Sequence, residues 1–169
     1  MHHVSNTFVK LTAESIATLY NVPISSLFEN APLTKADLER KNRWANWDSF
    51  VDWLDWIDTR SFGPVDWAEV GRHSPRGPSF ALANTLIRSS VSVRFGYHIA
   101  AKWLGESLIP VINSQVEYVG KNHVKETLVL IDSVRPFPKL FILFSGSLAL
   151  LLVIPTLQLD NFYPVITKD

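Results

Sequence analysis

Three basic side chains, Arg94, His98 and Lys102, recur at intervals of four in an otherwise apolar segment. On a helix this spacing places them in one narrow stripe. A mostly buried helix with such a stripe could present positive charge to an anionic ligand in a pocket. The more common meaning of such a stripe is the exposed edge of the helix, and the sequence leaves both interpretations open.

If the pocket exists, its ligand contacts should come from side chains that combine a polar tip with a large apolar body. The residues of this segment that meet this description are Arg94, Tyr97, His98 and Trp103. We therefore predict these four as the ligand-binding residues, and we assign no catalytic role to any of them.

Three aspartates, Asp48, Asp52 and Asp55, form a second periodic set at i, i+4 and i+7. Carboxylates on one helix face could bind a cation or act in acid–base chemistry. Nothing adjacent in the sequence would remove them from water, so we interpret them as a solvated face. The opposite arc of the same predicted helix is apolar: Trp44, Trp47, Phe50, Val51, Trp53, Leu54 and Ile57.

Sequence motifs for catalysis, metal binding or phosphate binding are not found. The histidines His73, His98 and His123 fall on three different predicted elements, and no HxxxH pair is present. There is no GxxxxGK[ST] loop and no GxSxG turn. We predict no metal, no cofactor and no catalytic residues, with a small enzyme as a remaining alternative.

Composition narrows the class of protein. The 169 residues are 47% hydrophobic and 19% charged, which is typical of one globular domain. Lysine plus arginine equals aspartate plus glutamate at 16 each, a balance that argues against nucleic-acid binding. The lack of cysteine fits a reducing compartment, and the N-terminus has no secretion signal. We expect a cytoplasmic protein.

The hydrophobic pattern predicts helices in the first 60 residues. The segment from Leu11 predicts a helix with Thr12 as its N-cap. After a break at Pro23, a short helix begins near Ser25 or Ser26. The segment "PLTKADLERKNRWANWDSFVDWLDWIDTR" predicts a long helix. A connection follows over 61–80, with one short helix around Val65–Val70.

The second half predicts mixed structure. After one or two helices over 79–112, alternating residues predict a β-hairpin with strands Gln115–Val119 and Val124–Ile131. Its final residues, from Leu128 to Ile131, are apolar on both faces, as in a central strand.

An uncharged run of 20 residues, from Leu140 to Leu159, follows the hairpin. As a helix it would be about 30 Å long, so it could cross a membrane and anchor a cytoplasmic head. We favour a buried helix that begins at Pro138 and ends before Pro155. A hairpin turning at Ser145-Gly146-Ser147 is a further soluble alternative.

These elements predict a single domain of the α+β class. N-terminal helices (1–60) and the connection (61–80) precede a mixed α/β part (81–169), which has a helix/β-hairpin core and a buried apolar C-terminal helix.

The order of elements from about Ile16 to Leu151 also resembles a known class of domain. It runs from "LFENAPLTKADLERKNRWANWDSFVDWLDWI" through "EVGRHSP" and "VSVRFGYHIAAKWL" to "RPFPKLFILFSGSLALL". It is similar to N-terminal input domains of bacterial histidine kinases, and its early part resembles the N-terminal region of AraC-type regulators. The resemblance implies a noncatalytic sensory domain that binds a small molecule or an output-module protein.

Overall fold

The computed structural model describes residues 2–39, 43–60, 63–77, 81, 85, 105–119, 123–131, 134–140 and 142–143. Helices are combined with two small antiparallel sheets, β1–β2 and β3–β4, so the predicted α+β class is confirmed. The elements are, in chain order, β1 (His3–Ser5), α1 (Asn6–Tyr20), η1 (Ile24–Leu27), α2 (Lys35–Glu39), β2 (Trp44–Asn46), α3 (Trp47–Asp58), α4 (Trp67–His73), η2 (Ser74–Arg76), α7 (Gly105–Leu108), β3 (Ile112–Val119) and β4 (His123–Leu130).

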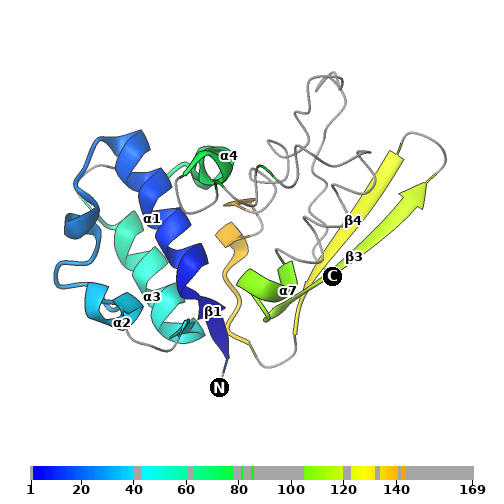
Figure 1. The fold of residues 1–169 in the computed structure, drawn as a ribbon, viewed down its shortest axis with the longest axis horizontal. Helices are drawn as coiled ribbons and strands as arrows, with labels where there is room; N and C mark the ends of the chain where they lie inside the picture. Colours follow the sequence, from blue (N-terminus) through cyan, green and yellow to red (C-terminus); the bar gives the residue numbers. More distant parts are fainter. Residues whose placement is uncertain are drawn as a thin grey trace.

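A short sheet ties the starts of the two longest described helices together (Figure 1). β1 pairs antiparallel with β2, with Val4 opposite Ala45. The pairing continues past both strands, because Trp47 donates its backbone N–H to the His2 carbonyl at 3.0 Å. Since α1 follows β1 directly and α3 follows β2 directly, this sheet fixes where both helices begin. The sequence predicted only helices in the first 60 residues, whereas the structure also has the strands β1 and β2 there.

Helix α1 begins earlier than predicted. Its N-cap is Ser5, whose hydroxyl accepts a hydrogen bond from the Thr7 backbone N–H at 3.2 Å. The predicted cap, Thr12, is instead buried within the helix and donates its hydroxyl to the Phe8 carbonyl at 3.0 Å. The prediction was wrong because the start of α1 is set by the pairing of β1 with a strand 40 residues away, which no local pattern reveals.

We expect Ser5→Ala to lower the free energy of unfolding by about 1 kcal/mol, because the helix loses its side-chain cap. Thr18→Ala is the matched control. Its exposed hydroxyl donates back to the Glu14 carbonyl of the same helix, an interaction that adds little to helix stability. Urea denaturation followed by circular dichroism measures both changes. Equal losses in the two variants would contradict the capping role of Ser5.

At its end α1 turns into a short 3₁₀ helix. Asn21 ends α1 in the left-handed conformation (φ 51°), a geometry that asparagine tolerates better than most residues. Pro23 then caps η1, so the predicted break at Pro23 and the short helix after it are confirmed.

The predicted long helix over 32–60 is instead three elements, α2, β2 and α3. Trp44 belongs to β2 and is 39% exposed, so it is not part of the apolar arc. Asn46 starts α3 by accepting the Ser49 backbone N–H on its side-chain oxygen at 3.0 Å. The other six residues of the predicted arc are buried, as expected: Trp47, Phe50, Val51, Trp53, Leu54 and Ile57.

The predicted connection over 61–80 contains helix α4, two residues later than expected. Asp66 caps it by accepting the Glu69 backbone N–H on its carboxylate at 3.0 Å, which sets the start at Trp67. Its buried residues face α1, which α4 contacts directly.

The β3–β4 hairpin confirms the prediction in place and pairing, with Ile112 opposite Leu130 and Val119 opposite His123. Its first strand begins three residues earlier than predicted. The expectation of a central strand was wrong at Val129, which is 47% exposed on the open side of the hairpin opposite Asn113. The far end of the hairpin extends away from the helices (Figure 1).

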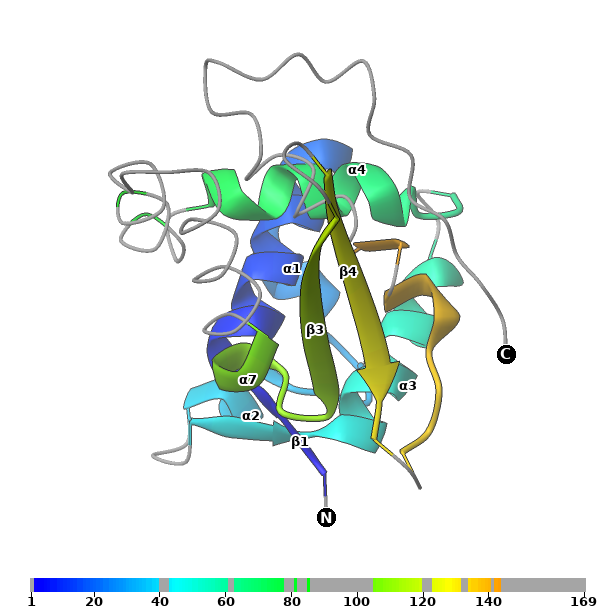
Figure 2. The same cartoon turned by 90° about the vertical axis from the view of Figure 1, so that its right-hand side faces the viewer.

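One hydrophobic core joins the two halves of the described chain. Residues of α1, α3 and α4 pack in the same cluster as Ile109, Val111 and Ile112 at the base of the hairpin. The segment after the hairpin also enters this cluster and runs beside α3 (Figure 2). Phe137, Leu140 and Leu143 are its buried side chains.

Two predictions lie outside the described residues. These are the helices expected over 79–112, apart from positions 81, 85 and 105–112, and the run from Leu140 to Leu159 beyond residue 143. Within the described ranges, no helix has both the length and the apolar character needed to cross a membrane.

Candidate functional site

The four predicted ligand-binding residues, Arg94, Tyr97, His98 and Trp103, lie outside the described residues. In the described part, a group of charged side chains lies where the segment after the hairpin contacts α3. We call residues 134–143 the strap. It follows the hairpin and includes a helical turn that begins at Pro138, the position predicted for a helix start.

The strap contacts the acidic face of α3. Asp48, Asp52 and Asp55 are exposed on one side of the helix, as their spacing predicted. The face is not occupied by water alone, however. The Arg135 guanidinium donates from Nη1 to Asp52 Oδ1, and from Nη2 to Asp55 Oδ2 at 3.1 Å. The predicted solvent exposure of these carboxylates is confirmed. Two of them also have a basic partner, Arg135, which lies 80 residues beyond Asp55 in the sequence.

The hydrogen bond to Asp52 raises the pKa of the Arg135 guanidinium, and the charges of Asp52, Asp55 and Asp48 act in the same direction. When folding raises the pKa of a cationic group, the folded state is stabilised at every pH below the pKa of the unfolded state. That stabilisation is lost only as the pH rises above it. Arginine is protonated in the folded and unfolded states throughout the physiological range. The contact is therefore fully charged at neutral pH and is weakened there by salt, not by pH.

Asp58, at the end of α3, is the most connected carboxylate of this group. Its Oδ1 accepts the Trp67 indole N–H at 3.2 Å and the Val65 backbone N–H at 3.4 Å. Its Oδ2 forms an ion pair with the Lys139 ammonium of the strap. Only 16% of the Asp58 side chain is exposed. One carboxylate thus joins α3, the start of α4 and the strap.

The strap is also held by apolar and backbone contacts. The Phe137 ring meets the Trp67 ring edge to face, with centroids 5.9 Å apart. The Arg135 carbonyl accepts the Trp47 indole N–H at 2.9 Å. Leu140 and Leu143 are each 1% exposed. Apolar burial therefore supplies most of the attachment, since exposed ion pairs contribute only about 0–1 kcal/mol each.

A buried polar contact joins α1 to the end of α4. Ser15 Oγ donates to the Leu11 carbonyl at 2.8 Å, and Ser74 Oγ donates to the Val70 carbonyl at 3.1 Å. The two hydroxyl oxygens lie 3.2 Å apart. Both hydroxyl protons have backbone acceptors, which satisfies these groups in the core. This arrangement holds two helices together and has none of the nucleophile–base pairing of a hydrolase.

The charged groups described here are better suited to attachment than to chemistry. Within the described ranges, no cluster of three or more His, Cys, Asp or Glu residues could hold a metal ion. His73 lies 3.6 Å from Glu69, which also pairs with Arg72 at 2.7 Å on the half-exposed surface of α4. Asp52, Asp55 and Asp58 are each paired with a basic side chain of the strap, which links the strap to α3.

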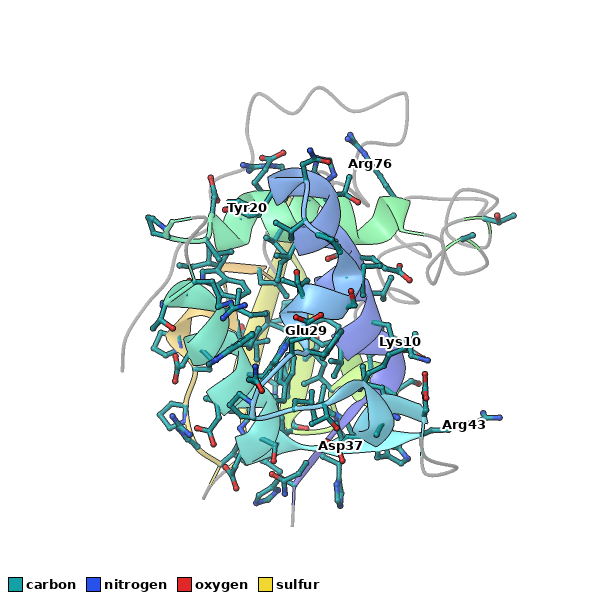
Figure 3. The ribbon with its side chains drawn as sticks, turned by 90° about the vertical axis from the view of Figure 1, so that its left-hand side faces the viewer. Lys10, Tyr20, Glu29, Asp37, Arg43 and Arg76 are labelled. Atoms are coloured by element: carbon teal, nitrogen blue, oxygen red, sulfur yellow. The ribbon has the colours of Figure 1, made fainter. Side chains whose placement is uncertain are left out.

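Figure 3 shows the described side chains on the opposite side of the molecule. In Figure 3 the labelled charged residues are spread from Arg76 near α4 to Asp37 and Arg43 near β2. Tyr20 lies close to α4, and its hydroxyl accepts the Asp66 backbone N–H at 2.8 Å. This contact joins the end of α1 to the start of α4.

The sequence analysis missed Asp58, Arg135 and Lys139. A usable signal was present. Asp58 continues the aspartate series three residues beyond Asp55. The two basic residues Arg135 and Lys139 are four residues apart, the same spacing as Asp48 and Asp52. The complementarity is visible once the two segments are compared, although their contact in space cannot be derived from either one.

Comparison with known proteins gives no relative from which a role could be transferred. No family model, no curated protein and no solved structure matches the chain. The resemblance to bacterial input domains therefore remains a prediction.

Proposed function

We propose that the chain is a noncatalytic sensory or partner-binding domain of the bacterial signalling type, acting in the cytoplasm. The observation that best supports the proposal is the strap. It continues directly from the hairpin and is attached to α3 through Arg135 and to α4 through Phe137. A binding event on the hairpin side thus has a physical route to the helical part.

The arrangement of the hairpin fits this role. Its base is built into the core through Ile112, while its far end extends from the helices (Figure 1). Val129 is exposed on its surface. A strand pair that is anchored in the core at one end is suited to contact a partner, and its displacement would pull on the strap.

The buried apolar C-terminal helix is part of the proposal. Leu140 and Leu143, the first residues of the uncharged run, are buried in the same core as α1 and α3. A membrane span that began at Leu140 would have to withdraw both side chains from that core. This supports the soluble interpretation of the run over the membrane anchor.

For the ligand we propose an anionic small molecule held by Arg94, Tyr97, His98 and Trp103. We expect a compound from a panel of cellular carboxylates and phosphates to raise the melting temperature of the wild-type protein. Arg94→Ala/His98→Ala should lose that response, because the cationic groups facing the anion are gone, while its melting temperature without ligand stays near wild type. Differential scanning fluorimetry measures both quantities.

The matched control is Arg72→Ala/His73→Ala, which removes the same two side-chain types from the surface of α4. It should keep the full ligand response. If the Arg94/His98 variant is unfolded, or responds as the wild type does, the assignment of these residues to a ligand site is wrong.

A further inference from the structure

We propose that the strap is a two-part device whose first half opens under electrostatic control while its second half stays in the core. The inference does not depend on the identity of any ligand. It goes beyond the proposed function, which assigns binding but no mechanism for a conformational response.

The two halves differ in what holds them. In the first half, residues 134–136, Arg135 and Pro136 are exposed and Val134 is half-buried. In the second half, Phe137, Leu140 and Leu143 are between 1% and 3% exposed. Because the free energy of burial follows the apolar area removed from water, the second half is firmly attached and the first half is not.

The first half depends on charge. Val134 packs only partly buried against the core. The polar contacts to α3 are the two Arg135 hydrogen bonds to Asp52 and Asp55, and the bond from the Trp47 indole to the Arg135 carbonyl. The Arg135 side chain is 44% exposed and each aspartate 49%, so salt reaches and screens the pairs. Local opening begins where few buried apolar contacts must be broken, which here is the first half of the strap.

The first half of the strap lies between the hairpin and Phe137, so its opening would affect how the hairpin is held. On its N-terminal side the hairpin ladder ends with Ile131, whose backbone N–H donates to the Val111 carbonyl at 3.0 Å. On its C-terminal side the strap is fixed by Phe137. Opening would release the first half of the strap from α3 while Phe137 keeps the second half in the core. Movement of the hairpin and release of Arg135 are therefore coupled.

The Trp47 indole N–H reports on this opening. Trp47 is buried, and its indole N–H bonds to the first half of the strap. Trp53 gives an internal reference, because its indole N–H donates to the Leu27 carbonyl, far from the strap in sequence. The chain has six tryptophans, so the two indole signals can be assigned by NMR with Trp47→Phe and Trp53→Phe.

The experiment compares the water-exchange rates of these two indole N–H groups in the full chain. We expect Arg135→Gln to accelerate exchange at Trp47 about fivefold and to leave Trp53 unchanged, because the weak charged contacts to Asp52 and Asp55 are lost. In the wild type, about 0.5 M NaCl should have the same effect, since the screening length falls well below 10 Å. In Arg135→Gln the added salt should change nothing further.

The matched control is Lys139→Gln, which removes one positive charge from the second half of the strap. It should leave exchange at Trp47 near the wild-type rate, because Phe137, Leu140 and Leu143 still hold that half. The proposal is overturned if neither salt nor Arg135→Gln accelerates Trp47, or if Trp53 accelerates equally, which would indicate global unfolding. Failure of the ligand screen would leave these rates unaffected, so the two proposals fail separately.

Discussion

Trp53→Ala is expected to lower the free energy of unfolding by about 3–5 kcal/mol, the largest single effect in the described core. Trp53 is fully buried between two rings, stacked on Phe28 with centroids 5.4 Å apart and on Phe50 at 5.9 Å. Its indole N–H donates to the Leu27 carbonyl at 2.7 Å. Truncation would leave a cavity and remove the hydrogen bond that joins η1 to α3.

Two further variants separate these contributions. Trp53→Phe keeps a ring in the stack but leaves the Leu27 carbonyl without its partner, so we expect a smaller loss of about 1–3 kcal/mol. Trp44→Ala removes the same side-chain type from an exposed position of β2 and should cost less than about 1 kcal/mol. Urea denaturation followed by circular dichroism avoids the fluorescence that the substitutions remove. A loss at Trp44 as large as that at Trp53 would contradict the burial described for these two residues.

Asp58→Ala is the second large effect, with an expected loss of about 2–4 kcal/mol. The alanine would leave the buried Trp67 indole N–H and the Val65 N–H without their acceptor. It would also release Lys139. The neutral donors should account for most of the loss, because Lys139 is 43% exposed and its ion pair is screened by water.

Asp58→Asn tests that division. It retains an oxygen for Trp67 while losing the charge that pairs with Lys139, so its loss should be clearly smaller than that of alanine. Lys139→Gln should cost less than about 1 kcal/mol. Chemical denaturation at constant ionic strength measures all three variants. If Lys139→Gln destabilises as much as Asp58→Ala, the ion pair and not the hydrogen bonds to Asp58 dominates this contact.

Local patterns were sufficient where a feature depends on neighbours in the sequence. The hairpin was predicted because its alternation and turn residues lie within one short segment. The apolar arc of α3 was predicted because six buried positions follow a helical period. The aspartate stripe was predicted for the same reason.

The remaining features depend on contacts between distant segments. The start of α1 and the division of the long helix both follow from the pairing of Val4 with Ala45. The charged attachment of the strap follows from Arg135 reaching Asp52, 83 residues away. Neither contact produces a periodic pattern within one short stretch of sequence. Each of them could therefore be identified only from the structure. The ligand assignment to Arg94 and its neighbours stays a prediction.

The position of the strap in the chain has a consequence for how the protein is made. Trp47 is bound by a carbonyl 88 residues further on, and the core around α1 and α3 is completed by Leu140 and Leu143. During synthesis the N-terminal helices therefore leave the ribosome long before their last core partners exist. Native pairing at such sequence separations slows folding and keeps apolar surface exposed meanwhile. The nascent chain thus has a long interval in which a chaperone could bind the surface that the strap later covers.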